Sequence, residues 1–246
     1  MPFGMYRKVN HSRPLGWRAE SDRSYLSKYA LTAATMPSAA QPIVLGVGWY
    51  SKFDVPVQDG PFPWSRWWIG RGKDIGYIRG GHAICALPGD AKDQWNWWTY
   101  YNQGVEGSCV GFALSRAVSL MNRRMYDARW LYREAQLVDE WPETPPESGT
   151  SVNAGCKVLV SKGHKLYKGD QVWPEDIGQG IAAYRWARSV DDIHNALKNP
   201  DADRLGAIPL LNSWGLDYPR KVWLPDEVVD RLVFQEYGEC AVLTDR

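Results

Sequence analysis

The feature that most constrains this chain is the stretch of residues 100–114, which places Cys109 at the start of an apolar segment, directly behind a glycine-containing turn. Apolar side chains then recur at a spacing that predicts one buried helix face: Phe112, Ala113, Ala117, Val118 and Met121. A helix N-terminus carries about half a positive charge and favours a thiolate. Cys109 is therefore the candidate nucleophile, against the common alternative that a free cysteine is inert packing.

The remaining patterns place strands early and late in the chain and helices between them. Apolar runs bounded by turn residues predict strands at 42–50, 76–87, 207–215 and 239–244. Further helices are predicted after Asp127 and Ser151, and Ser189 with Asp192 resembles a capping box. We also expect a loop at 60–72, a helix end at 199–203 and a short helix at 223–232. This order predicts the α+β class.

Composition narrows the possible partners. The 246 residues are 44% hydrophobic, which is enough to fill one large domain or two lobes. With 29 Lys and Arg against 28 Asp and Glu, the net charge of +1 gives no global field for nucleic acid or an anionic membrane. We therefore expect peptide or protein partners, no nucleic acid and no membrane. The polar N-terminus has no apolar signal-peptide core, so we expect a soluble protein, cytoplasmic or virion-associated.

The cysteines and tryptophans could form sites of their own. Four cysteines lie far apart, without the paired spacing of a zinc site or the density of a disulfide scaffold, so we expect free thiols, no metal and no cofactor. Fourteen Trp include clusters at 64–68 and 95–98. Such aromatics usually fill a core or seal an interface, and a binding surface is the alternative.

Three residues are candidate partners for the Cys109 thiol. His82 follows two glycines at the entrance of a predicted strand, and Asn212 lies within another. An imidazole beside the thiol would take its proton, and a side-chain amide would hold the ring in the correct tautomer. Gln103 precedes Cys109 by six positions, and its amide with the Cys109 N–H could stabilise an oxyanion.

Together these segments resemble papain-like cysteine peptidases. Residues 103–109 look like the nucleophile motif Gln-Gly-x-x-Gly-Ser-Cys, 81–83 resemble the histidine motif, and 212–215 match Asn-Ser-Trp-Gly. The resemblance implies that Cys109 is the nucleophile, His82 the general base and then acid, Asn212 the orienting amide and Gln103 an oxyanion donor. It also implies that Trp214 shields the His82–Asn212 bond.

The resemblance further implies a two-lobe fold, with a helical lobe and an antiparallel β-barrel-like lobe. We expect residues 1–40 to be a leader or arm and 41–246 to be the peptidase domain, with 41–98 and 201–246 in the β lobe and 99–200 in the helical lobe. Gly149 and Thr150 resemble the loop that holds the substrate backbone.

Three departures from the family pattern bear on activity. The family runs Cys, His, Asn, whereas His82 here precedes Cys109 by 27 residues. We interpret this as a transposition of the strands around residues 42–90 to the front of the chain. Val110 stands where the family usually has Trp, and a second Trp-Gly after Asn212 is absent. Site geometry does not depend on chain order.

Three hypotheses follow from these motifs. The first is a cysteine endopeptidase that hydrolyses peptide bonds through a Cys-His-Asn triad and an acyl-enzyme. The second is a catalytically silent papain-like module used for binding or in an assembly such as a virion. The third is a permuted NlpC-type cell-wall hydrolase, against which the glutamine motif and the Asn-Ser-Trp-Gly motif argue.

Overall fold

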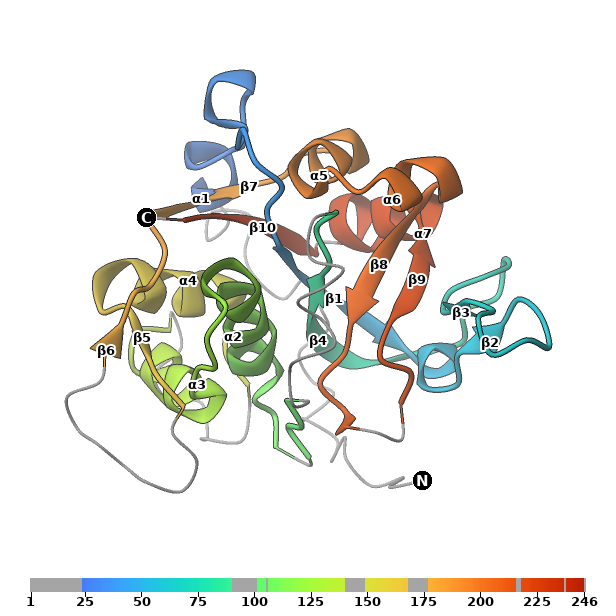
Figure 1. The fold of residues 1–246 in the computed structure, drawn as a ribbon, viewed down its shortest axis with the longest axis horizontal. Coiled ribbons are helices and arrows are strands. Elements are labelled where there is room, and N and C mark those ends of the chain that lie inside the picture. Colours follow the sequence, from blue (N-terminus) through green and yellow to red (C-terminus); the bar gives the residue numbers. More distant parts are fainter. Residues whose placement is uncertain are drawn as a thin grey trace.

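A large open sheet organises the chain in the computed structural model, which describes residues 24–89, 101–104, 106–139, 149–167, 177–215, 218–236 and 238–245 (Figure 1). Its strand order is β2-β3-β9-β8-β4-β1-β10-β7. The strands are β1 (Ile43–Tyr50), β2 (Val57–Gln58), β3 (Trp67–Trp68), β4 (Ile78–Ala86), β7 (Ala183–Trp186), β8 (Ala207–Leu211), β9 (Val222–Pro225) and β10 (Glu239–Thr244). Neighbours pair antiparallel, except that β3 and β9 are parallel.

The predicted α+β class is confirmed. Over the residues that the structure describes, β2 and β7 are the outer strands and do not pair with each other, so the sheet is not a closed barrel. A second, small sheet pairs β5 (His164–Lys165) with β6 (Ile177–Gly178). Mixed helices and one large, mostly antiparallel sheet therefore define the architecture.

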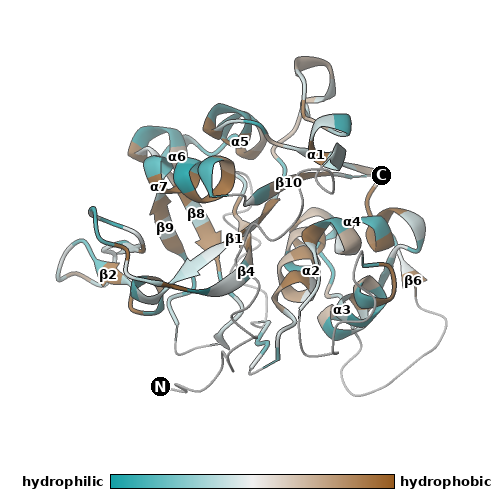
Figure 2. Ribbon diagram, turned by 180° about the vertical axis from the view of Figure 1, so that it is seen from behind, coloured by the Kyte–Doolittle hydropathy of each residue, from teal (hydrophilic) through white to brown (hydrophobic). Residues whose placement is uncertain are grey.

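Helices cover both faces of the sheet. One face carries α2 (Cys109–Asn122) and α4 (Val152–Ser161), with α3 (Ala128–Leu137) packed on both. The other face carries α5 (Val190–Leu197), α6 (Pro200–Leu205), α7 (Asp226–Asp230) and a π-helical turn, η6 (Arg231–Gln235). Figure 2 shows these two groups on either side of the central strands. The short elements are α1 (Ser24–Lys28), η2 (Ala33–Thr35) and η3 (Ser51–Asp54).

The alternation of side chains along the central strands divides the core in two. In β1, Ile43 and Leu45 belong to the apolar cluster under α5 and η6, whereas Val44 belongs to the cluster under α2 and α4. In β4, Ala83 and Cys85 point into the second cluster. Because successive residues of a strand face opposite sides, β4 presents Ala83 to α2, the helix that begins at Cys109.

The helix starts predicted from local sequence are confirmed. Helix α2 begins at Cys109, and α4 begins after Ser151, whose side chain accepts a hydrogen bond from the Ala154 N–H. Ser189 caps α5 in the same way, by accepting from the Asp192 N–H. A capping side chain satisfies an N–H group that the helix leaves unpaired, so the signal is local and survives in the fold.

Two local predictions are right only in part. The helix predicted from Ser189 does end at Leu197, before the polar residues 199–203, but the Asn199 side chain also accepts from two N–H groups and starts α6. The segment 223–232 is not helical throughout: β9 continues to Pro225, and α7 begins only at Asp226. Pro225 has extended dihedrals at the N-cap. An apolar run before a proline fits a strand end and a helix start equally well.

Some predicted boundaries shift or lie outside the described residues. The predicted loop at 60–72 contains the short strand β3, and the strand predicted for 207–215 ends at Leu211. Residues 29–31 bond to Trp186 along the edge strand β7, and Leu31 is fully buried. The Trp cluster at 95–98 and most of the predicted leader, residues 1–23, lie outside the described residues.

Candidate active site

The candidate nucleophile lies at the first residue of α2, where the helix packs against β4. Cys109 is partly exposed, whereas Cys85, Cys156 and Cys240 are fully buried free thiols. Burial raises the pKa of the Cys109 thiol, while hydrogen bonds from the backbone N–H groups of Ala83, Val110 and Cys109 itself act to lower it. The thiol is therefore protonated at neutral pH, within a ring of donors that would stabilise a thiolate.

His82 and Asn212 meet in a buried hydrogen bond. The His82 Nε2 atom lies 3.0 Å from the Asn212 Oδ1 atom. Asn212 Oδ1 also accepts from the Ser213 N–H at 2.8 Å, which fixes the orientation of the amide. Because a carbonyl oxygen only accepts, Nε2 carries the hydrogen and Nδ1 is the basic nitrogen. Burial lowers the pKa of His82 to about 4, against the smaller opposing effect of the Asn212 bond.

Two tryptophans enclose the His82 ring. The Trp49 ring centroid lies 4.7 Å from that of His82, and the Trp214 centroid lies 5.0 Å away. Trp49 and Trp214 also pack edge to face, at 5.0 Å. Aromatic walls on the imidazole exclude water from the His82–Asn212 bond, which favours the neutral ring. Trp214 thus packs against the His82 ring, beside the bond to Asn212.

Sheet topology explains how distant segments converge. Strands β4 and β8 are antiparallel neighbours, and Cys85 pairs with Leu211, the residue before Asn212. The hydrogen bond from the Ala83 N–H to the Cys109 sulfur then joins β4 to the start of α2. Ala83 thus contacts the start of α2, and the side chain of its neighbour His82 contacts Asn212, although His82 precedes both Cys109 and Asn212 in the chain.

Gln103 is joined to the Asn212 turn through its backbone. The Gln103 N–H donates to the Ser213 carbonyl at 2.9 Å, and Asn102 forms a bridge with Trp214. The Gln103 side chain is buried, and its Nε2 donates to the Glu106 carbonyl at 3.1 Å. An amide nitrogen has two hydrogens, so one Nε2–H remains for a further acceptor. Gln103 Oε1 has no partner in the described part of the chain.

Gly149 and Thr150 flank the nucleophile turn. Gly149 has φ of +87°, and a Cβ placed there would lie 3.7 Å from the Gly107 carbonyl oxygen. The Thr150 hydroxyl donates to Asp139 Oδ2 at 2.5 Å, and the Ser151 N–H donates to the same atom at 3.0 Å. The backbone of Gly149 thus lies beside the turn that precedes Cys109.

Two contributors to this site were missed from the sequence. The sequence does indicate that Trp49 lies on the same face of its strand as Val47, because the two are two residues apart. Its contact with His82, however, depends on the pairing of β1 with β4. Asp139 gave no signal, because it lies after a predicted helix and reaches Thr150 only in the fold. Neither position forms part of the sequence motifs.

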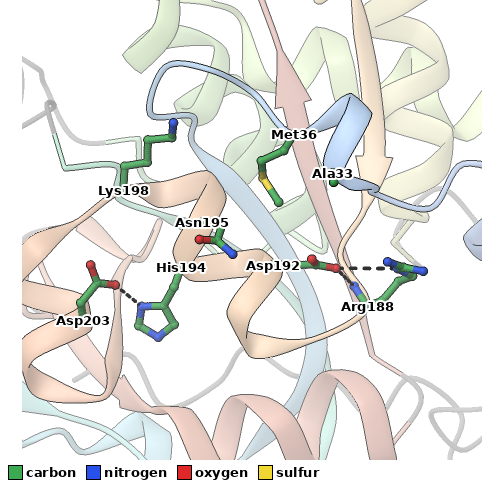
Figure 3. A pocket seen from close by; sticks show the side chains of 8 residues that line it. All are labelled: Ala33, Met36, Arg188, Asp192, His194, Asn195, Lys198 and Asp203. Atoms are coloured by element: carbon green, nitrogen blue, oxygen red, sulfur yellow. Dashed lines mark hydrogen bonds and ion pairs between the residues drawn. The ribbon is translucent and has the colours of Figure 1, made fainter.

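A cavity lies away from these residues. It measures about 830 Å³ and is lined by residues of η2, α5, α6 and their flanks: Ala33, Met36, Arg188, Asp192, His194, Asn195, Lys198 and Asp203 (Figure 3). Its charged groups are already engaged: Arg188 with Asp192, His194 with Asp203, and Lys198 with the Ser38 carbonyl. None of the predicted site residues lines it.

The described residues contain neither a metal-binding cluster nor a helix that could span a membrane. In residues 24–245, apart from the gaps given above, no group of three or more His, Cys, Asp or Glu side chains could hold a metal ion. Within the same residues, no helix is both long enough and apolar enough to cross a bilayer.

Comparison with known proteins gives likeness of fold only. No model of a known protein family matches the chain, and no curated protein matches it. Among solved structures, xylellain, a cysteine protease from Xylella fastidiosa, is 14% identical with a TM-score of 0.47, covering 65% of this chain and 92% of its own. Digestive procathepsin L2 proteinase from Tenebrio molitor larval midgut is 18% identical with a TM-score of 0.42, and the match covers 63% of this chain and 67% of its own.

A third structure, from work on the mite allergens Blo t 1 and Der p 1, is 12% identical with a TM-score of 0.41 and covers 92% of this chain and 82% of its own. These identities and TM-scores are low. The functional assignment therefore rests on the geometry around Cys109.

Proposed function

We propose that the chain is a cysteine peptidase in which Cys109 attacks the carbonyl carbon of a peptide bond. The observation that carries the proposal is the 3.0 Å bond between His82 Nε2 and Asn212 Oδ1, formed beside the residue whose N–H binds the Cys109 sulfur. A neutral imidazole beside a helix N-terminal thiol is the arrangement that nucleophilic acyl transfer needs.

The reaction proceeds in two halves. His82 Nδ1 takes the thiol proton as the sulfur bonds to the carbonyl carbon, and the Cys109 N–H and Gln103 Nε2–H stabilise the resulting oxyanion. The C–N bond then breaks as His82 returns the proton to the leaving amine, which leaves a thioester. A water molecule, deprotonated by His82, attacks the thioester, and the protonated imidazole returns its proton to the leaving sulfur, which releases the acid.

Burial makes the resting pair neutral. The pKa of the Cys109 thiol is raised and that of His82 is lowered to about 4, and both effects oppose a thiolate–imidazolium ion pair. Proton transfer therefore accompanies attack on the substrate. Asn212 and Trp214 hold the ring in one tautomer and one orientation during that transfer. In this proposal Gly149 and Thr150 contact the substrate backbone.

Cys109→Ala and Cys109→Ser test this proposal. Both variants keep the helix start, so both should fold as the parent does. We expect each to lose hydrolysis of casein and of a fluorogenic peptide library. Iodoacetamide should modify the parent at Cys109 alone, because the other three cysteines are fully buried. Hydrolysis that persists in Cys109→Ala would refute the proposal.

The second candidate is a catalytically silent module with the same fold. It is favoured by the neutral pair, since a thiol of raised pKa reacts slowly in the absence of a base. A parent protein that binds a peptide but releases no product, and whose Cys109 resists iodoacetamide, would identify it. Peptidoglycan should be tested as a substrate in the same assay. Digestion of peptidoglycan without digestion of peptides would indicate a cell-wall hydrolase.

A further inference from the structure

The sequence cluster around Trp64 lies in a segment rich in exposed apolar side chains that the proposed active site does not use. Most of the large apolar side chains exposed in the described ranges fall in one segment, residues 55–78, here named the aromatic hairpin. They are Val55 at 57%, Val57 at 64%, Phe62 at 53%, Trp64 at 78%, Trp67 at 37%, Tyr77 at 73% and Ile78 at 44%. Figures 1 and 2 show β2 and β3 projecting from the end of the sheet away from α2 and α3.

Hydrogen bonds within the aromatic hairpin fix its conformation. Trp68 is buried against Trp223, and its Nε1 donates to Asp59 at 3.0 Å. Asp59 also accepts from the Arg66 N–H at 2.8 Å, which closes the loop. At the tip, the rings of Phe62 and Trp64 stack with centroids 4.9 Å apart and planes 3° apart. The tip is thus an ordered platform of aromatic rings.

The charges around the platform are predominantly positive. Residues 51–79 contain five basic and three acidic side chains. Every acidic one has a partner: Asp54 binds Arg79, Asp59 binds Trp68, and Asp74 binds Lys52. Arg71 and Lys73 are exposed, and no carboxylate pairs with either in the described ranges; Arg71 lies over the Trp68 ring, 4.4 Å from its centroid. The near-zero charge of the whole chain therefore hides a local positive surface.

We propose that the aromatic hairpin docks on an anionic phospholipid bilayer. Trp and Phe rings partition to the headgroup level, where one end is apolar and the other wet. Exposed Lys and Arg beside them bind anionic headgroups. Phe62 and Trp64 enter the interface, and Arg71 and Lys73 contact the headgroup phosphates and carboxylates. Such docking departs from the expectation, drawn from net charge alone, that the chain binds no membrane.

The charge favours a bilayer over the other possible occupants. A second copy of this chain carries 29 basic against 28 acidic side chains, so it offers Arg71 and Lys73 less net negative charge than a bilayer that contains an acidic lipid. A neutral sugar ring would stack on Trp64 but would gain nothing from two exposed cations. A bilayer that contains an acidic lipid can take up the aromatic rings at its interface and bind the two cations through its anionic headgroups. Docking is independent of the peptidase proposal, because β8 and β9 separate β2 and β3 from the part of β4 that carries His82.

Co-sedimentation of the full chain with sucrose-loaded vesicles tests the proposal. The vesicles are phosphatidylcholine with 30% phosphatidylserine in one series and phosphatidylcholine alone in the other. We expect binding to the anionic series that weakens with salt. Arg71→Gln with Lys73→Gln should weaken it about 25-fold, since each cation near the surface contributes about fivefold. Phe62→Ser with Trp64→Ser should weaken binding to both series.

Matched controls separate docking from general effects. Arg124→Gln with Tyr167→Ser removes one exposed cation and one exposed ring on the helical side, and should bind as the parent does. Cys109→Ser should also bind normally, whatever the outcome for hydrolysis. Equal binding by the hairpin variants and the parent, or no binding to anionic vesicles, would overturn the proposal. So would a concentration-dependent dimer that Trp64→Ser abolishes, since a second copy would then be the occupant.

Discussion

Replacing Asn212 by Asp tests the electrostatics of the proposed site most directly. The substitution keeps the oxygen that lies 3.0 Å from His82 Nε2 and that accepts the Ser213 N–H, and it adds a negative charge. In the parent, burial lowers the pKa of His82 to about 4. An opposite charge within about 4–6 Å moves a pKa by about 1–3 toward the charged form. We therefore expect the pKa of His82 in the variant to be higher by about 1–3.

The sign of the effect on rate follows from the role of the base. Only the neutral imidazole can take the Cys109 proton, so kcat/KM should rise as pH increases through the His82 pKa. The acidic limb of the parent should lie near pH 4, and that of Asn212→Asp should move to higher pH. A tenfold change in the acid dissociation constant of His82 corresponds to about 1.4 kcal/mol between its two protonation states.

Two measurements check this prediction. The kcat/KM profile between about pH 3.5 and 8 reports the catalytic limb, and an NMR titration of the His82 ring reports the same pKa without requiring turnover. Asn102→Asp is the matched control, since it adds a charge to an exposed neighbour of Trp214 without touching His82. A parent limb near the ordinary histidine value of about 6.5, or an unmoved pKa in Asn212→Asp, would contradict the reasoning.

Two further predictions concern stability. Tyr101→Phe should destabilise the fold by about 1–3 kcal/mol, as measured by urea unfolding. The reason is that the buried Tyr126 N–H loses the hydroxyl oxygen that accepts its hydrogen bond at 2.9 Å. Tyr77→Phe, at an exposed position, is the control, and an equal effect of both substitutions would contradict this reasoning. Burial lowers the folded pKa of His82 to about 4 and that of His164 to about 3, so the unfolded chain binds more protons below the ordinary value. The free energy of unfolding should therefore decrease as pH falls from about 6.5 toward 4, by about 3 kcal/mol for His82. Urea unfolding curves that coincide at pH 6.5 and 4.5 would rule this out.

Local physics accounts for the parts of the fold that could be predicted. Helix α2 starts at Cys109 because an apolar 3.6-residue period follows a turn, and α4 and α5 start after Ser151 and Ser189 because a hydroxyl caps the first turn. Each of these signals lies within a few residues. The incomplete predictions arose where one signal fits two outcomes. Asn199 before Pro200 indicates a helix end, and α5 does end at Leu197, yet the same pair is also the N-cap and the first-turn proline of α6.

The order of residues along the chain identifies which groups could perform chemistry: a cysteine at a helix start, a histidine after two glycines, an asparagine before Ser-Trp-Gly and a glutamine six positions ahead of the thiol. Their meeting depends on the folded chain, because the pairing of β4 with β8 and the packing of α2 on β4 are contacts between distant segments that no local pattern encodes. Which tryptophans are buried and which are exposed also depends on the folded chain. Trp64 and Trp68 belong to one sequence cluster, but β3 pairs with β9 and buries Trp68 against Trp223, while Trp64 lies outside the strand and stays in water.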